Sequence, residues 1–276
     1  MTNWQKQIIP ILLTFITFLT LCFLLFLFIR GLNLFPINDK IIPHLNITDV
    51  LVGLTIYLKT SVDFAIFIGN LMVKNSGMKD RIAIETGTAF GNALGTFFIL
   101  FLWTFFKEIP ILMIFMILLA ALVLFRMGED GLLEYLENGK KSFLIFFIGL
   151  VLKFLKPINF VFRPLVGLFL PKNKTVYSKK TTFFQLFAFA VSIPLILGLD
   201  DFAGYIPLFN IINVFGFAVG VFLGHMILNA ALFVSPSTTI KIVRKPFIVL
   251  AGSVAFLGIG LWGIWEIIGL IIRVFF

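Results

Sequence analysis

Residues 50–73 read VLVGLTIYLKTSVDFAIFIGNLMV, an apolar stretch of 24 residues in which Lys59 and Asp63 are the charged side chains. Roughly 20 apolar residues are enough for a helix to cross the hydrocarbon core of a bilayer. The two charges together cost about 6 kcal/mol on insertion scales, and the Leu, Ile, Val and Phe residues return roughly 4 to 8 kcal/mol. The stretch therefore predicts a marginal membrane span, whose charges mark a structural or functional site.

The rest of the chain has the composition of an integral membrane protein. Of its 276 residues, 60% are hydrophobic and 13% are charged, and the mean hydropathy is +1.10. A soluble domain carries about 25% charged residues to cover its surface. This composition excludes a soluble enzyme, a secreted domain and a disordered chain. Cys22 is the single cysteine, so no disulfide framework is expected.

Seven apolar runs are each long enough to cross a bilayer. The first has no evident cleavage site, and we expect it to remain as an N-terminal anchor helix. An eighth apolar stretch, 142–170, is interrupted by lysines, an arginine and prolines, so we expect it to lie in the membrane interface. The seven predicted spans are 8–29, 50–73, 82–106, 109–125, 183–206, 209–234 and 247–272.

The basic residues fall unevenly on the two sides that these spans define. One side holds seventeen Lys and Arg residues and the other holds four. The positive-inside rule assigns the richer side to the cytoplasm. We therefore expect a multi-pass protein of the cytoplasmic membrane with a cytoplasmic N-terminus. Because the basic residues are dispersed over loops, no nucleic-acid partner is expected.

The sequence contains an internal repeat. Asp63-Phe64-Ala65 and Asp201-Phe202-Ala203 both lie in apolar runs, and in each case the next run carries a glycine at every fourth position. Small residues at this spacing allow close helix packing in membranes. Two unrelated packing stripes are the alternative, but their matched places favour a repeat. The two glycine stripes are Gly87, Gly91 and Gly95, and Gly216, Gly220 and Gly224.

The two halves run in opposite directions across the membrane, because the second and fifth spans do. The predicted fold is therefore all-α, with an anchor helix followed by a 3+3 inverted repeat. Its units are 1–47 (anchor helix and external loop), 48–126 (first repeat), 127–181 (basic cytoplasmic loop with the interfacial segment) and 182–276 (second repeat). Inverted repeats place their binding site near the midplane, at the interface between the halves.

This arrangement would bring Asp63 and Asp201 toward each other, with Asp200 pointing about 100° away along the same helix. Facing carboxylates repel when both are ionised, and either a proton or a divalent cation relieves that repulsion. Competition between protons and a metal ion for one pair is the chemistry of a metal/proton exchanger.

Other polar residues are candidates for the same pathway. Lys59 is four residues from Asp63, so the two could form an ion pair that is either structural or replaced by substrate. Glu85 is either an ion-entry carboxylate or a snorkelling one. His225 and Asn229 share a helix face and are either metal ligands or hydrogen-bonded packing residues.

At these motifs the sequence resembles the CadD-type cadmium-resistance transporters, within the superfamily of lysine exporters, TerC-like proteins and manganese exporters. Thr60-Ser61-Val62-Asp63-Phe64 is similar to the family's Thr-x-Ile-Asp-Asp, with Phe64 in place of its second Asp. Residues 198–209, GLDDFAGYIPLF, are similar to its Gly-x-Asp-Asn-x-x-x-Tyr-x-Pro-Leu-Phe. The resemblance implies a 3+3 inverted fold and efflux of a divalent metal, with Asp63, Asp200 and Asp201 in the ion pathway.

We therefore expect a transporter rather than an enzyme, exporting a divalent, cadmium-like cation by proton exchange. No nucleotide-binding motif is present, so an ion gradient would supply the energy. An exporter of small organic solutes such as basic amino acids is the alternative. A lipid-directed enzyme and a scaffold subunit fit the paired acidic motifs less well. The expected partners are the lipid bilayer, the transported ion and protons, without an organic cofactor, and a homo-oligomer is compatible with the sequence.

Overall fold

The computed structural model describes residues 3–138, 144–166, 182–197, 205–209 and 212–275. Within these ranges every regular element is a helix. The elements are α1 (Asn3–Leu32), α2 (Ile47–Thr60), α3 (Val62–Lys74), α4 (Met78–Phe106), α5 (Pro110–Asn138), α6 (Leu144–Val166), α7 (Phe183–Leu197), the 3₁₀ helix η1 (Ile206–Leu208), α9 (Val214–Val234), α10 (Pro236–Val243) and α11 (Pro246–Phe275).

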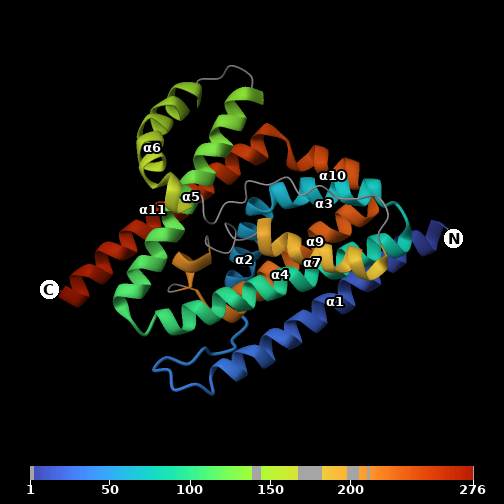
Figure 1. Cartoon of the computed structure of the whole chain (residues 1–276), viewed down its shortest axis with the longest axis horizontal. Helices are drawn as coiled ribbons and strands as arrows, with labels where there is room; N and C mark the ends of the chain where they lie inside the picture. The colour runs from blue at the N-terminus through green and yellow to red at the C-terminus, as the bar shows by residue number, and fades with distance from the viewer. Residues whose placement is uncertain (1–2, 139–143, 167–181, 198–204, 210–211, 276) are drawn as a thin grey trace.

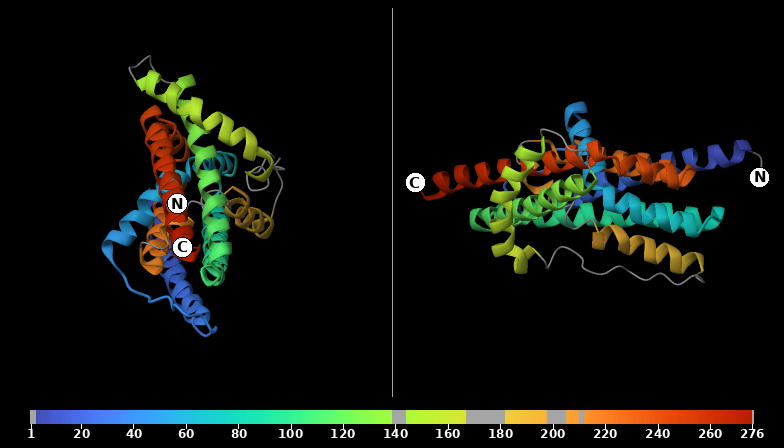
Figure 2. Two further views of the ribbon diagram at one scale, coloured as in Figure 1. Left: turned by 90° about the vertical axis from the view of Figure 1, so that its left-hand side faces the viewer. Right: turned by 90° about the horizontal axis from the view of Figure 1, so that it is seen from above.

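Six of the described helices are long and apolar enough to cross a membrane, and the bent pair of α2 and α3 makes a seventh span. The prediction of an all-helical, multi-pass membrane protein with about seven spans is therefore confirmed. The helices α1, α4 and α11 run along the long axis of the molecule, and the two termini lie at opposite ends of it (Figures 1 and 2).

By length and composition, α6 is one of the candidate spans, whereas the sequence placed this stretch in the membrane interface. The helix α6 is continuous through Pro157 and Pro164 and is itself long and apolar enough to span, so our expectation that these residues divide it was wrong. Apolar helices tolerate an internal proline where neighbouring groups satisfy the freed carbonyl. The predicted span 183–206 begins with α7 (Phe183–Leu197), and residues 198–204 of it lie outside the described residues. Seen from above, α6 lies crosswise to α4 and α11 (Figure 2).

The span predicted over residues 50–73 is broken. The helices α2 and α3 meet at Ser61 with a bend of 65°. The Thr60 hydroxyl and the Ser61 amide both donate to the Tyr57 carbonyl oxygen, at 3.1 and 3.0 Å. Ser and Thr side chains compete with helical backbone hydrogen bonds and so favour such breaks. The break places the end of α2 and the start of α3 at the edge of a cavity.

The helix α5 continues well past the predicted end of its span at residue 125, as far as Asn138. Arg126 forms salt bridges with Glu129, at 3.3 Å, and with Asp130, at 3.1 Å. The amide of Asn159 on α6 also donates to Glu129 Oε2 at 2.6 Å. These contacts hold the polar extension in helical form. Residues 127–138, which we predicted in a cytoplasmic loop, therefore belong to the helix.

Three helix pairs have the most extensive packing, namely α2 with α9, α4 with α7, and α5 with α11. In the first two pairs, glycines bring the backbones together. A Cβ atom added at Gly220 would lie 2.1 Å from the Val50 carbonyl oxygen, and one at Gly91 would lie 2.2 Å from that of Val191. Such close approach is the packing use of small residues in membrane helices.

The direction of each pair follows from its contacts. Gly53 lies against Phe217 and Gly224 against Tyr57, so residue numbers increase together and α2 and α9 are parallel. The helices α4 and α7 are parallel by the same criterion, since Gly87 lies against Phe187 and Gly91 against Val191. The helices α5 and α11 are antiparallel, because Gly131 lies against Ser253 while Gly263, further along α11, lies against Ile117.

The helix α9 is the centre of the bundle. Of the 18 most apolar consecutive residues of α9, 72% are buried, whereas the corresponding share for α1 is 11%. It contacts α2, α1, α4, α3 and α10, and Figure 1 shows it in the middle of the molecule. The helix α1 lies at the periphery, packed on α9 and α4, and most of its surface is free to face lipid.

Candidate functional site

A cavity of about 170 Å³ lies where α2 and α3 separate. Its walls come from this break, from the polar extension of α5 and from the first half of α11. The cavity therefore exists because the span is broken and because α5 is longer than its apolar part. It is lined by Lys59, Thr60, Val62, Asp63, Met127, Asp130, Gly131, Glu134, Ile248, Val249, Gly252, Ser253 and Phe256.

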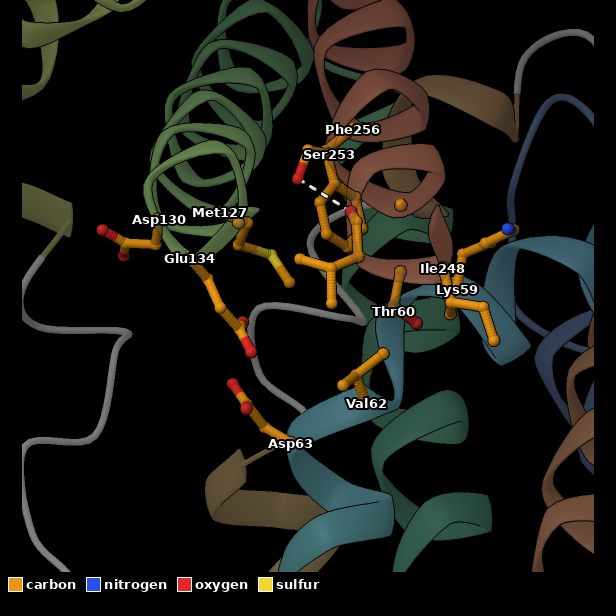
Figure 3. A pocket seen from close by; sticks show the side chains of 13 residues that line it. Lys59, Thr60, Val62, Asp63, Met127, Asp130, Glu134, Ile248, Ser253 and Phe256 are labelled. Atoms are coloured by element: carbon orange, nitrogen blue, oxygen red, sulfur yellow. Dashed lines mark hydrogen bonds between the residues drawn. The ribbon is translucent and has the colours of Figure 1, made fainter. Parts of the chain in front are cut away.

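Three carboxylates line this cavity, two of which face each other. The carboxylates of Asp63, at the start of α3, and of Glu134, on α5, point toward one another (Figure 3). Asp130 lies one turn before Glu134, and its carboxylate points away from the facing pair (Figure 3). It forms the salt bridge with Arg126. Arg244 is near enough for its positive charge to act on both Asp63 and Glu134.

The predicted ion pair between Lys59 and Asp63 is absent from the described part of the chain, where the salt bridges are those of Arg126. In Figure 3 the Lys59 side chain points away from Asp63. The reason is the bend at Ser61, because residues four apart share a face only on a continuous helix. Both residues nevertheless line the cavity, and Gly252 approaches the Lys59 carbonyl oxygen, to which a Cβ would be 3.4 Å.

The structure brings His225, Asn229 and Glu85 together, as a group separate from the carboxylates of the cavity. His225 Nδ1 is 2.6 Å from the Tyr57 hydroxyl, and Nε2 is 2.9 Å from Asn229 Nδ2. Asn229 Nδ2 also reaches Thr88 Oγ1, at 3.0 Å. Both ring nitrogens of His225 are thus engaged, which is the hydrogen-bonded arrangement rather than a metal-ligating one.

The remaining predicted site residues are two aspartates and six glycines. Asp200 and Asp201 lie outside the described residues. The predicted packing glycines lie on α4 (Gly87, Gly91, Gly95) and α9 (Gly216, Gly220, Gly224), where all six are buried. Gly87 and Gly91 face α7, and Gly216, Gly220 and Gly224 face α2.

Among the described residues, no group of three His, Cys, Asp or Glu side chains is arranged to hold a metal ion. The facing pair of Asp63 and Glu134 supplies at most four carboxylate oxygens. Two carboxylates at close range hold either a shared proton or a cation more tightly than one does. The cavity therefore has the chemistry of a reversible cation or proton site rather than of a structural metal centre.

A second cavity, of about 580 Å³, lies at the opposite end of α5 and α11. It includes Asp39, Lys107, Glu266 and Arg273 together with aromatic side chains. Lys107 donates to the Asp39 carbonyl oxygen and lies 4.7 Å from the centre of the Trp103 ring. Burial lowers the pKa of Lys107 from its ordinary value, and the charges of Asp39 and Glu108 partly oppose that shift.

Sequence reasoning missed Glu134 and Asp130 as site residues. Both were assigned to a loop, because the apolar run ends at Phe125. Arg126 and Asp130 at i and i+4, followed by Glu134 four residues later, form a stripe along one helix face. That spacing was the available signal that the helix continues.

No protein-family model, curated protein or solved structure matches this chain. The likeness to cadmium-resistance transporters therefore rests on the two short motifs alone.

Proposed function

We propose that this protein is a membrane transporter that exports a divalent metal cation in exchange for protons. The observation that carries the proposal is the pair of facing carboxylates, Asp63 and Glu134, at a break in a membrane-spanning helix (Figure 3). Broken helices at membrane depth are typical of transporters, where they line the substrate cavity. Ionisable residues within spans mark ion pathways.

The helix pairs support an inverted repeat. In each half, we take a broken or short first helix (α2 with α3, or α7), a glycine-striped second helix (α4 or α9) and a long third helix (α5 or α11). In this scheme α2 corresponds to α7, α4 to α9 and α5 to α11. Replacing each helix by its counterpart turns the α2–α9 pair into the α7–α4 pair, and the α5–α11 pair remains the same pair. The directions also agree, since both exchanged pairs are parallel and the third pair is antiparallel. A two-fold axis in the membrane plane requires this pattern.

The cavity lies toward one side of the membrane. Glu134 is four residues before the end of α5, and Ile248 is two residues after the start of α11. The positive-inside rule assigns these ends to the cytoplasm, because Lys241, Arg244 and Lys245 precede α11. Under this orientation the cavity receives substrate from the cytoplasm, as an exporter needs.

The size and charge of the cavity favour a small cation. Sites for small organic ligands have volumes of roughly 300 to 1,000 Å³, whereas this cavity measures about 170 Å³. Moving two positive charges outward against 100 mV costs about 4.6 kcal/mol, so export needs an energy source. Protons entering the cell in exchange for the metal would supply it. The short motifs shared with CadD-type transporters support the same class of substrate.

The test is metal flux in proteoliposomes that contain the purified full-length protein and a divalent-sensitive dye. Cd²⁺, Zn²⁺ and Mn²⁺ are added outside under an imposed pH gradient, with the membrane potential clamped. We expect flux of at least one metal, and loss of that flux when an ionophore collapses the pH gradient. Flux that is independent of the gradient would contradict proton exchange. Absence of metal flux together with uptake of radiolabelled lysine would show that the substrate is an organic solute and not a metal.

A further inference from the structure

A second buried acidic site lies apart from the cavity, at the contact of α4 with α1 and α9. Glu85 on α4 is 0% exposed. The hydroxyl of Thr14 on α1 donates to Glu85 Oε1 at 2.8 Å. Within the described residues the salt bridges are those of Arg126, so no basic side chain pairs with Glu85 there. A fully buried carboxyl group without a cationic partner is costly in ionised form.

The backbone carbonyl group of Glu85 adjoins a chain of hydrogen-bonded polar side chains in the core of the bundle. Asn229 Nδ2 lies 3.0 Å from Thr88 Oγ1 and 3.5 Å from the Glu85 carbonyl oxygen. The same amide donates to His225 Nε2, so that nitrogen carries no proton. The proton of the neutral ring is then on Nδ1, which donates to the Tyr57 hydroxyl. The chain runs from α4 through α9 to α2.

A count of donors and acceptors shows what this network lacks. Two buried oxygens of this network, Glu85 Oε2 and Asn229 Oδ1, have no hydrogen-bond partner among the described residues. The Asn229 oxygen is always an acceptor, and Glu85 Oε2 is an acceptor when the carboxyl group is ionised. Thr14 donates to Oε1 and Thr88 donates to the Glu85 carbonyl oxygen. The buried Nε of Arg81, one turn earlier on α4, has no hydrogen-bond partner among the described residues and does not donate to Oε2. With Glu85 ionised, these acceptor oxygens therefore have neither a hydrogen-bond donor nor a cation bound to them.

We propose that Glu85 carries an exchangeable proton on Oε2 and is the group through which protons drive transport. The proton removes the buried charge and converts Oε2 from an unpaired acceptor into a donor. This proposal rests on the proposed exporter function and adds to it a proton site that is separate from the metal-binding carboxylates. The site is completed by α1, which lies outside the repeat, so the anchor helix gains a specific role.

The charged and titratable groups around Glu85 are few. The helix α9 contributes His225, and α1 carries Lys6 about two turns before Thr14 and Cys22 and Arg30 two or more turns beyond it. On α4 itself, Arg81 lies one turn earlier, and its guanidinium donates to the Phe233 carbonyl oxygen at the end of α9. The helix α7 has no titratable residue between Phe183 and Leu197. The helices α3 and α5 also contact α4; their charged residues are Asp63, Lys74, Arg126, Glu129, Asp130, Glu134 and Glu137.

Infrared spectroscopy of the reconstituted full-length protein tests the assignment without requiring transport. A protonated carboxylic acid has a carbonyl-stretch band that an ionised carboxylate lacks. We expect the difference spectrum of wild type minus Glu85→Gln at pH 7 to contain this acid band. Glu137→Gln, which changes an exposed carboxylate of α5, should leave it in place. Thr14→Val should shift it to higher frequency, because the carbonyl oxygen loses a hydrogen bond, and this variant also serves if Glu85→Gln fails to fold.

Other results would overturn the proposal. Carboxylate bands in place of the acid band would show that Glu85 is ionised at pH 7. An acid band that disappears on addition of Na⁺ or K⁺ at constant pH would assign the site to a monovalent cation. In proteoliposomes, Glu85→Gln should keep metal–metal exchange and lose accumulation driven by the pH gradient, by at least tenfold. An acid band in a protein without metal flux would refute the exporter and the coupling role together, while the protonated state of Glu85 would stand.

Discussion

The carboxylates of Asp63 and Glu134 face each other across the cavity where α2 and α3 separate, although the two residues are 71 positions apart in the chain (Figure 3). Asp63 comes from an apolar span and Glu134 from the polar end of α5. Their meeting requires both the bend at Ser61 and the continuation of α5 past its apolar run. Two features that look unfavourable for membrane helices thus produce the candidate site together.

The glycine contacts of α4 with α7 and of α9 with α2 lead to a stability prediction. Gly91→Ala or Gly220→Ala should destabilise the protein by roughly 1 to 3 kcal/mol, because the added Cβ meets a backbone oxygen that cannot rotate away. The measurement is the thermal unfolding midpoint of purified protein in detergent. Gly258→Ala on α11 is the matched control, since a Cβ there has no atom within 4 Å. Equal midpoints for Gly220→Ala and Gly258→Ala would contradict the close packing of α2 on α9.

The orientation makes a labelling prediction. In a Cys22→Ser background, Ser76→Cys between α3 and α4 should react with an impermeant maleimide only from the cytoplasmic side. Lys40→Cys, between α1 and α2, should react only from the opposite side. Both positions are exposed, so failure to react reports sidedness rather than burial. Labelling of both residues from the same side would refute the assigned span between them.

The helix α6 docks on α5 through a buried apolar cluster and one buried amide. Asn159 is 2% exposed and donates to Glu129 Oε2 at 2.6 Å. Asn159→Leu should cost roughly 1 to 3 kcal/mol, because the buried Glu129 carboxylate loses a donor. The readout is again the unfolding midpoint, with Phe160→Ala, at a 77% exposed position of α6, as the control. A larger loss in the control would show that α6 is held by its outer face.

The sequence was sufficient to predict a helical membrane protein of about seven spans, because hydropathy and span length are local properties. It also singled out Asp63 and the two glycine stripes, since unusual residues in apolar runs need a reason. The contacts of Gly91 with Val191 and of Gly220 with Val50 show that the stripes bring helices together.

Tertiary packing decided what the sequence could not show. The spacing of Lys59 and Asp63 predicted an ion pair, but the helix bends between them, and nothing in the local pattern fixes a bend at Ser61. Glu134 was missed because the end of an apolar run does not mark the end of a helix. Its extension is held by Arg126 and by Asn159 on a different helix.

The most direct test of the central claim is metal flux through variants of α3 and α5 in proteoliposomes. Asp63→Asn and Glu134→Gln should each lower the flux of the transported metal at least tenfold, because each removes one of the two facing carboxylates. Glu137→Gln, an exposed carboxylate on the same helix as Glu134, should leave the flux within twofold. Wild-type flux from both Asp63→Asn and Glu134→Gln, in protein shown to be folded, would contradict transport through this cavity.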